Sequence, residues 1–229
     1  MGSHGAPHRR PSGGGHLVGI DPGLRAIALA TKGFMPASEG DALYSAACSR
    51  GITPAGHAFV EIGSYCGRST VWLGAAARQS ATMLYAVDHH GGSEENQVGW
   101  EWHDASLVDS ASNRINTLPY FQHTIASCGL NDVVCAIVGD SSSIGSTWSI
   151  PIDFLFIDGG HGADVAHRDY EAWTRHVALG GLLAIHDVFS DPNQGGQAPY
   201  EQIYLPAVDS GEFIEMSEVG SLRILKRIS

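Results

Sequence analysis

The sequence predicts an α/β protein with a doubly wound, mostly parallel sheet that closes with an antiparallel hairpin. Three observations carry this prediction: short apolar runs separated by helical stretches, a glycine-containing turn after the first run, and two final strands with no room for a helix between them. Continuous apolar runs are typical of parallel strands that helices cover on both faces. A chain of 229 residues can bury a full core as one domain, which we expect over residues 16–229.

The elements are expected to alternate along the chain. Leu43, Tyr44 and Ala47 recur at helical spacing and predict a helix from Ser38 to about Arg50, within a leading helical segment of about 35–50. The strands of the parallel part are predicted at 58–62, 83–88, 133–138, 152–157 and 182–186. Their helices are predicted at about 69–79, 111–128 and 163–178, the last ending at Gly180-Gly181. The closing hairpin is predicted from strands 212–216 and 221–226.

Composition excludes several classes of function. The chain has 13 Lys and Arg against 24 Asp and Glu, a net charge of −11, so it lacks the basic excess of a general nucleic-acid or anionic-membrane surface. No segment approaches the roughly 18 apolar residues of a membrane span. The four cysteines form no C-x-x-C pair, so we expect free thiols and a cytoplasmic location. Residues 1–15 are expected to be a flexible tail or a remnant of an expression tag.

The glycine-containing turn indicates a nucleotide-type cofactor. The first apolar strand ends in Glu61, and Gly63 and Gly67 follow before a helix of small residues begins. Glycines without a Cβ let the backbone bend tightly and approach a ligand. The second strand ends in Asp88, placed as an acid that holds the two hydroxyls of a ribose. A loop of this kind together with a ribose acid indicates a cofactor that contains adenosine.

Polar residues follow every parallel strand, at the edge where ligands bind in such sheets. The third strand is followed by Gly139-Asp140-Ser141, the fourth by Asp158-Gly159-Gly160-His161, and the fifth by His186-Asp187. We therefore expect two carboxylates and two imidazoles to converge on one rim. Such a set can hold a divalent cation or a proton acceptor beside a substrate hydroxyl.

Together, these motifs resemble the class I S-adenosylmethionine-dependent methyltransferases over about residues 35–229. The turn reads E-x-G-x-x-x-G with Tyr65 in place of a middle glycine, and its G-x-x-x-G-R-S-T form is similar to small-molecule and sugar O-methyltransferases. The resemblance implies a Rossmann-like, seven-stranded sheet of order 3-2-1-4-5-7-6 and methyl transfer from S-adenosylmethionine to a hydroxyl oxygen. Residues 35–44 are similar to the leading helix of methylmannose-polysaccharide 1-O-methyltransferases, which implies a sugar or polysaccharide acceptor.

The resemblance also implies roles in cofactor binding. Glu61 is expected at the methionine ammonium group, Ser69 near the methionine carboxylate, and His89 beside the adenine. Gly139, Asp140 and Ser141 are expected at the adenine amino group and edge, with helix capping as the alternative for Asp140 and Ser141. The cofactor-binding residues expected in full are Glu61, Gly63, Ser64, Gly67, Ser69, Asp88, His89, Gly139, Asp140, Ser141 and Asp158.

Catalysis is expected at the rim formed by Asp158, His161 and His186. Related O-methyltransferases bind a divalent ion with an acid after strand 4 and an Asp-Asp or Asp-Asn pair after strand 5. Here Asp158, His186 and Asp187 would hold Mg²⁺ or Mn²⁺, and the histidine would favour softer ions; alternatively, Asp187 caps its loop and His186 packs on the cofactor. A proton acceptor with a pKa near neutrality suits methyl transfer to an alcohol, and we favour His161 over His186 for that role.

Alternatives remain open at the level of function. A nicotinamide dehydrogenase also uses a glycine turn and a ribose acid, but this chain has no room for a second catalytic domain. The acceptor could instead be a phenol or catechol, and a non-catalytic cofactor-binding or scaffold protein is a third class. An insertion of about 89–112 carries Trp100 and Trp102 near acids, which suits a polyhydroxylated ring, a lid over the core, or a homodimer contact.

Overall fold

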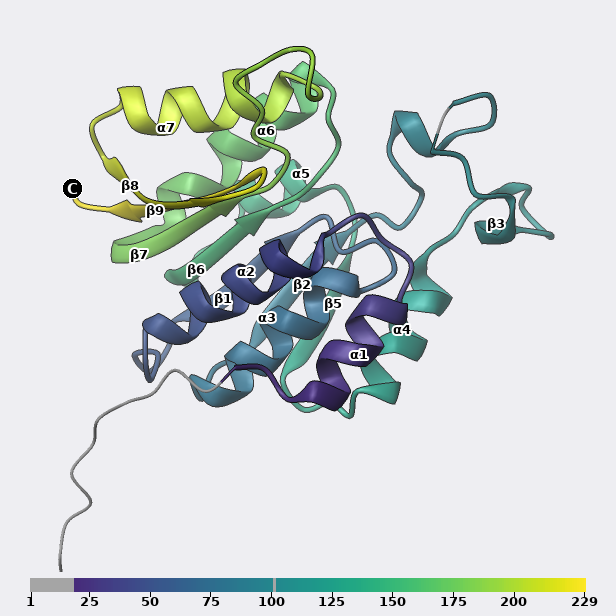
Figure 1. Cartoon of the computed structure of the whole chain (residues 1–229), viewed down its shortest axis with the longest axis horizontal. Coiled ribbons are helices and arrows are strands. Elements are labelled where there is room, and N and C mark those ends of the chain that lie inside the picture. The colour runs from purple at the N-terminus through teal and green to yellow at the C-terminus, as the bar shows by residue number, and fades with distance from the viewer. Residues whose placement is uncertain (1–18, 101) are drawn as a thin grey trace, which may run out of the picture.

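Seven strands form one mixed sheet in the order β5-β2-β1-β6-β7-β9-β8 (Figure 1). The computed structural model describes residues 19–100 and 102–229. The five parallel strands are β1 (Ala58–Ile62), β2 (Leu84–Asp88), β5 (Val134–Val138), β6 (Ile152–Ile157) and β7 (Val177–Ile185). The antiparallel hairpin is formed by β8 (Phe213–Val219) and β9 (Leu222–Arg227). Counted along the chain, the strands of this sheet follow the order 3-2-1-4-5-7-6, so the predicted fold class is confirmed.

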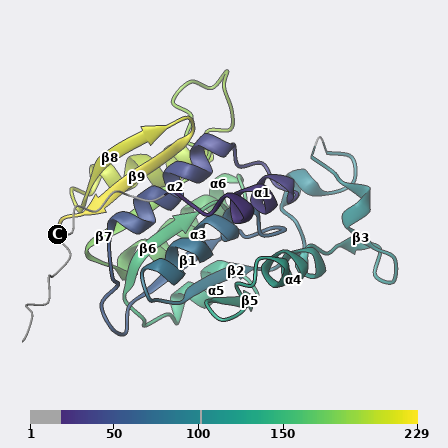
Figure 2. The same ribbon diagram turned by 60° about the horizontal axis from the view of Figure 1, so that its bottom comes forward.

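Helices cover both faces of the sheet because successive side chains of each strand point to opposite sides. On β6, Phe154 and Phe156 pack into one apolar cluster, and Leu155 and Ile157 into the other. The helices on the first face are α1 (Pro22–Ala30), α2 (Ala37–Ser49), α3 (Arg68–Gln79) and α4 (Leu118–Ser127). Those on the second face are α5 (Ser141–Ser146), α6 (Ala163–Trp173), η4 (Tyr200–Tyr204, a π-helical turn) and α7 (Leu205–Asp209). Figure 2 shows the sheet between these two layers.

The predicted helix 163–178 is too long. Helix α6 ends at Trp173, a short turn η3 (Thr174–His176) follows, and β7 already begins at Val177. Gly180 and Gly181 therefore lie inside a strand instead of ending a helix. Gly180 has φ +77°, and a Cβ on Gly181 would lie 3.0 Å from the carbonyl oxygen of Ile152. The glycines mark the place where the β6–β7 register shifts, which is the other common use of glycine in a strand.

The predicted helix 111–128 begins later than expected. Residues before it form a second, two-stranded sheet, β3 (Val108–Asp109) and β4 (Arg114–Ile115), after the short turns η1 (Glu94–Asn96) and η2 (Ala105–Leu107). The Asp109 carboxylate accepts hydrogen bonds from the backbone and hydroxyl of Ser112, and Asn113 has φ +53°. A side chain that bonds its own backbone favours a turn over a helix.

Helices α1, α5 and α7 were not predicted. Helix α5 follows Asp140 and reads Ser-Ser-Ser-Ile-Gly-Ser, a composition typical of loops. It forms because the Asp140 side chain caps its first turn and Gly145 fits against Trp173, where a Cβ would lie 2.8 Å from the ring. Tertiary packing thus overrides local composition at this helix.

The parallel strands direct their carboxyl ends to one edge of the sheet. The insertion that carries β3 projects beyond the body of the molecule at this edge (Figure 1). In the part of the chain that the structure describes, no helix is both long enough and apolar enough to cross a bilayer. The predicted tail, residues 1–15, lies outside the described residues.

Candidate functional site

A cavity of about 880 Å³ lies at the carboxyl ends of the parallel strands. This volume is within the range of small-molecule and cofactor sites. Twelve of the residues singled out from the sequence line it: Gly63, Ser64, Ser69, Asp88, His89, Gly139, Asp140, Ser141, Asp158, His161, His186 and Asp187. Glu61 and Gly67 are not among the residues of its wall. The topology therefore gathers most of the predicted site in one place.

The loop between β1 and α3 is held close to β6. Gly63 has φ +85°, and a Cβ there would lie 2.1 Å from the carbonyl oxygen of Asp158, so only glycine fits. Gly67 caps α3 with φ +92°, and its Cα faces Phe121 and Thr124 of α4 instead of the cavity. The close approach at Gly63 is thus to the backbone at the end of β6, at a position that lines the cavity, whereas Gly67 serves the turn and the helix packing.

Asp88 fastens the glycine loop to the end of β2. Its Oδ2 accepts hydrogen bonds from the backbone amides of Ser64 (3.0 Å) and Tyr65 (2.7 Å), and its Oδ1 accepts one from the amide of His90 (2.6 Å). A carboxylate offers about four lone-pair positions, so one remains for a ligand hydroxyl. Ser64 is 1% exposed, and within the described part of the chain its Oγ makes no hydrogen bond. Both groups have unused hydrogen-bonding capacity at the cavity.

Glu61 lies beneath the loop and supports it. The hydroxyls of Ser69 and Thr70 each donate to one of its carboxylate oxygens at 2.6 Å, and its side chain is fully buried. Burial raises the pKa of Glu61 to about 8, and the two hydroxyl groups offset only part of this effect. Glu61 is the acid expected at the cofactor's ammonium group, but it lies outside the cavity wall, whereas Asp158 lines the cavity.

Asp140 and Ser141 line the cavity just after the end of β5. Asp140 accepts hydrogen bonds from the amide of Ser143 (2.8 Å) and the hydroxyl of Ser142 (2.9 Å), so it caps α5 while lining the cavity. The hydroxyl of Ser141 donates to Asp169 of α6. The helix-capping alternative therefore applies to Asp140, and the cavity contact is present as well.

Asp169 is a lining residue that the sequence analysis missed. It is 2% exposed, and burial raises its pKa to about 6. The available signal was its position on α6. Asp169 shares the buried face with Ala166 and Trp173, three and four residues away, where an unpaired acid is unusual.

His186 connects the end of β7 to two other elements. Its Nε2 lies 2.6 Å from Oε2 of Glu39 on α2, and its Nδ1 lies 3.0 Å from Oδ1 of Asp158. Burial alone would lower the pKa of His186, but the charges and hydrogen bonds of these carboxylates and of Asp187 raise it well above its usual value. Both ring nitrogens are thus already engaged. Glu39 was not foreseen as part of the site.

His161 lies between two carboxylates. Its Nδ1 is 2.7 Å from Oε1 of Glu95, in the insertion, and its Nε2 is 3.0 Å from Oδ2 of Asp187. Burial opposes the charged form, but the hydrogen bonds to Asp187 and Glu95 raise the pKa of His161 to about 10. The imidazole is therefore a cation at neutral pH in this arrangement. The expected pKa near neutrality does not hold while both carboxylates face the ring.

The rim has the composition of a cation site. One ligand atom each from Asp158, His161 and Asp187 can be chosen so that all three lie within 4.8 Å of one another. Asp187 adopts φ +54°, an unusual backbone conformation that aims its side chain at this cluster. The pKa of Asp187 is lowered because the hydrogen bonds from His161 and His186 outweigh its burial. The structure thus brings together the predicted Asp158 and Asp187, with His161 instead of His186 as the third member.

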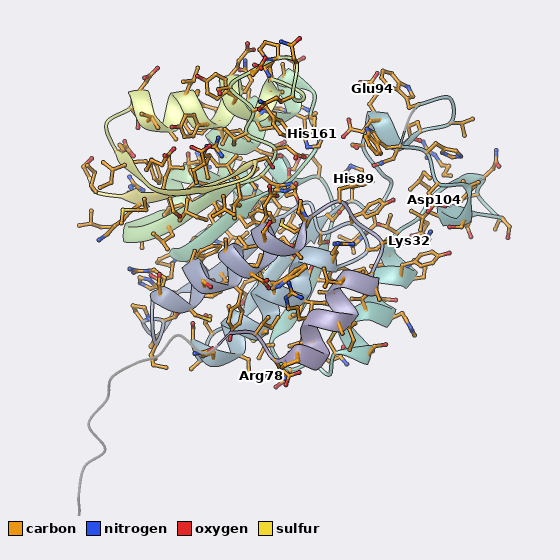
Figure 3. The ribbon with its side chains drawn as sticks, viewed as in Figure 1. Lys32, Arg78, His89, Glu94, Asp104 and His161 are labelled. Carbon is orange, nitrogen blue, oxygen red and sulfur yellow. The ribbon has the colours of Figure 1, made fainter. Side chains whose placement is uncertain are left out.

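Aromatic side chains line the outer part of the cavity. The Phe34 ring lies 5.8 Å from that of Tyr65 and meets Trp102 of the insertion edge to face at 5.3 Å. Trp102 and Phe34 line the cavity, whereas Trp100 is exposed outside its wall. Lys32 forms an ion pair with Asp104 and donates to Ser106 Oγ, which ties the insertion to the segment after α1. In Figure 3, His161 and His89 lie at the sheet edge that faces the insertion, and Lys32 lies beside Asp104.

Comparison with known proteins agrees with this geometry. Residues 60–188 match the family model of the methyltransferase domain, and because this match spans more than half of the chain, the protein belongs to that family. Its structure is similar to that of the O-methyltransferase NovP, with 14% identity, coverage of 84% of this chain and 81% of that one, and a TM-score of 0.63.

Two further solved structures share the fold. The O-methyltransferase TomG from Streptomyces achromogenes, in complex with SAM, is 16% identical, with coverage of 93% and 92% and a TM-score of 0.61. The O-methyltransferase from Bacillus cereus, in complex with SAH, is 17% identical, with coverage of 90% and 88% and a TM-score of 0.60. At these identities, the likeness establishes the common fold.

Proposed function

We propose that this methyltransferase-family protein transfers the methyl group of S-adenosylmethionine to a hydroxyl oxygen of a small molecule. One observation carries the proposal. A single cavity is lined both by the β1–α3 loop with Asp88 and by the rim of Asp158, His161 and Asp187. A methyl donor held on the loop would lie in the same cavity as the rim, where an acceptor hydroxyl could meet it. Similar structures are described as O-methyltransferases with SAM or SAH bound, which supports the same chemistry here.

The cavity residues fit this cofactor. The free acceptor position of Asp88 suits a ribose hydroxyl, and the unpartnered Oγ of Ser64 suits a polar group of the methionine end. Asp158 offers a carboxylate for the ammonium group. The buried carboxylate of Asp169, beside Ser141, suits the adenine amino group as a hydrogen-bond donor. Each of these contacts uses a group whose capacity the protein itself leaves unfilled.

A divalent cation fits the rim. Asp158 and Asp187 would supply oxygen ligands and His161 a nitrogen ligand. His186 lies deeper, between Glu39 and Asp158, and serves as a support. A carboxylate–imidazole set suits Mn²⁺ or Co²⁺ as well as Mg²⁺. A bound cation would polarise the acceptor hydroxyl. Because Glu95 holds its Nδ1, His161 would use its Nε2 either as a cation ligand or, with no cation on that nitrogen, as the acceptor of the hydroxyl proton.

The acceptor class we favour is a sugar. The Trp102 and Phe34 rings offer faces for the C–H side of a sugar ring, and the carboxylates of Glu95 and Asp187 can accept hydrogen bonds from its hydroxyls. A phenol or catechol is the second candidate, since the same rings accept an aromatic acceptor. The free thiols of the four cysteines fit a cytoplasmic enzyme.

The test of this function uses methyl-labelled S-adenosylmethionine with panels of glycosides and phenols. Product should carry the label on oxygen, as determined by mass spectrometry. His161→Ala should lower kcat by about 100-fold or more and leave the Kd for S-adenosylhomocysteine within a few-fold, because the group acts mainly in the transition state. His123→Ala, at an exposed position on α4, is the matched control and should leave both values unchanged. Equal losses of turnover and cofactor affinity in His161→Ala would place proton transfer elsewhere.

The cation is tested on the same reaction and by direct binding. Chelation with EDTA should remove activity, and Mn²⁺, Mg²⁺ or Co²⁺ should restore it. Asp187→Ala should weaken Mn²⁺ binding, followed by electron paramagnetic resonance, by about tenfold or more. Full activity after exhaustive chelation would exclude the cation and leave Asp187 as a group that orients His161.

A further inference from the structure

A second cavity of about 450 Å³ adjoins the first on the far side of Asp187. The two cavities share five wall residues, Phe34, His186, Asp187, Phe189 and Gln194. Asp187 belongs to the rim where we place the reacting hydroxyl, so a ligand that extends past this residue enters the second cavity. The cofactor loop and Asp88 contact only the first cavity. The second cavity therefore has no part in holding the methyl donor.

The wall of the second cavity is built by segments that brace one another. The Phe189 ring lies on the backbone of Gly195, where a Cβ would lie 2.3 Å from the ring. Gln197 Nε2 donates to the carbonyl oxygens of Phe189 and Gly195, both at 3.1 Å. On the opposite side, Glu39 Oε1 accepts a hydrogen bond from the amide of Ser221 at 2.7 Å, which fixes the β8–β9 turn against α2. The cavity is thus a formed part of the fold.

The chemistry of this wall is polar, with aromatic faces. Its charged side chains are already paired: Arg223 with Glu218 at 2.8 Å, and His186 with Glu39 and Asp187. Three carboxylates, Glu39, Asp187 and Glu218, stand against the single guanidinium of Arg223, which is already paired, so a phosphate or other anion would meet repulsion. Ser190, Gln194 and Ser221 add neutral donors and acceptors. Phe34 and Phe189 add ring faces.

We propose that the second cavity binds a neutral, polyhydroxylated unit of the acceptor, so that the acceptor has at least two linked sugar rings. One ring presents its hydroxyl beside Asp187 in the first cavity, and the next ring lies between Phe189 and the Glu218–Arg223 pair. The carboxylates accept hydrogen bonds from ring hydroxyls, and the aromatic rings stack on the C–H face. This inference rests on the proposed function and specifies its acceptor.

The test compares one-ring and two-ring acceptors on the intact protein. The probes are mannose with mannobiose, and glucose with maltose, which keep the anomeric hydroxyl as well as the ring hydroxyls free. The blocking variant is Ser190→Phe, because Ser190 is exposed and lines only the second cavity. Ser49→Phe, at the exposed end of α2, is the matched control. Binding to the S-adenosylhomocysteine-saturated protein is measured by calorimetry, and transfer by label incorporation.

The two-ring probe of the preferred sugar should have a kcat/KM at least about tenfold above that of its one-ring partner. Ser190→Phe should remove this advantage in both binding and transfer and leave the one-ring probe within about twofold, while Ser49→Phe changes neither. Equal values for one and two rings would overturn this inference and leave the methyl transfer standing, as would transfer to phenols alone. Failure to bind S-adenosylhomocysteine would instead overturn the proposed function itself.

Discussion

At the scale of single residues, Glu61 shows how a buried acid couples the cofactor loop to stability. It is fully buried, its carboxyl group accepts hydrogen bonds from two hydroxyls of the described chain, and its pKa is raised to about 8. In the unfolded chain it ionises near its ordinary pKa, around 4.3. Because its pKa is higher in the folded than in the unfolded protein, protonated Glu61 stabilises the fold. This contribution to the free energy of unfolding is complete below about pH 4 and is lost as pH rises to about 8.

Replacing Glu61 should therefore change how stability depends on pH. Glu61→Gln keeps a group that can hydrogen-bond to both hydroxyls and removes the ionisation. The free energy of unfolding of the mutant should therefore rise relative to that of the wild type by a few kcal/mol between about pH 5 and pH 8. The difference in the free energy of unfolding between the two proteins, from denaturant titrations across this range, is the measurement. Glu171→Gln, at an exposed position on α6, should run parallel to the wild type. A constant difference across the range would show that Glu61 is charged in the folded protein.

The residues of the site divide by how far their partners lie in sequence. Asp88 and His161 could be predicted because Asp88 ends an apolar strand and His161 lies in the short loop after another. Glu39 and Glu95 could not, since their partners His186 and His161 lie 147 and 66 residues away, and no local pattern announces such a contact. The pKa of His161 follows from these distant carboxylates, which is why an expectation based on the ordinary value for histidine was wrong.

At the scale of elements, the insertion between β2 and α4 supplies one wall of the cavity. Its Trp102 contacts Phe34 and lines the cavity, whereas Trp100, two residues earlier, does not line it, although the two side chains are about equally exposed (51% and 54%). The sequence does not distinguish the two indoles, because aromatic residues beside acids do not reveal which one lines a cavity. The Lys32–Asp104 ion pair then fixes the insertion on the body of the protein.

The two tryptophans give a matched pair for testing the acceptor wall. Trp102→Ala should raise the KM for the acceptor by about tenfold, because the lost ring face is worth on the order of 1 kcal/mol or more. The Kd for S-adenosylhomocysteine should stay within about twofold. Trp100→Ala should leave both constants unchanged. An equal effect of both substitutions would show that the insertion acts as a whole and that Trp102 has no special contact with the acceptor.

At the scale of the whole molecule, the strand order and the edge that carries the site could be predicted from the apolar runs. Buried parallel strands leave little freedom in how they are ordered once the connections are right-handed and the chain ends in a hairpin. The elements that were predicted wrongly contain glycine or serine, which occur both inside regular elements and in the loops that end them. Gly180 and Gly181 bend a strand, and the serines after Asp140 form α5, because packing against Ile152 and Trp173 decides the outcome.

The global charge agrees with the site. A net charge of −11, together with the paired cations of the second cavity, favours neutral acceptors and a cationic methyl donor over anionic substrates. The sulfonium and ammonium groups of S-adenosylmethionine would enter a cavity lined by Asp88, Asp158 and Asp187. The acidic lining of the cavity and the direction of the parallel strands thus both indicate the carboxyl ends of these strands as the site.

The most direct measurement is calorimetric titration of the protein with S-adenosylhomocysteine and, separately, with NAD⁺. We predict a saturable heat with S-adenosylhomocysteine and none with NAD⁺. Asp88→Ala should weaken the binding by about tenfold or more, since it removes both the ribose acceptor and the anchor of the Ser64 and Tyr65 amides. The affinity of Asp88→Asn, which keeps one acceptor oxygen, should lie between those of the wild type and Asp88→Ala. Binding of NAD⁺ with no heat from S-adenosylhomocysteine would contradict the assignment of this cavity to a methyl donor.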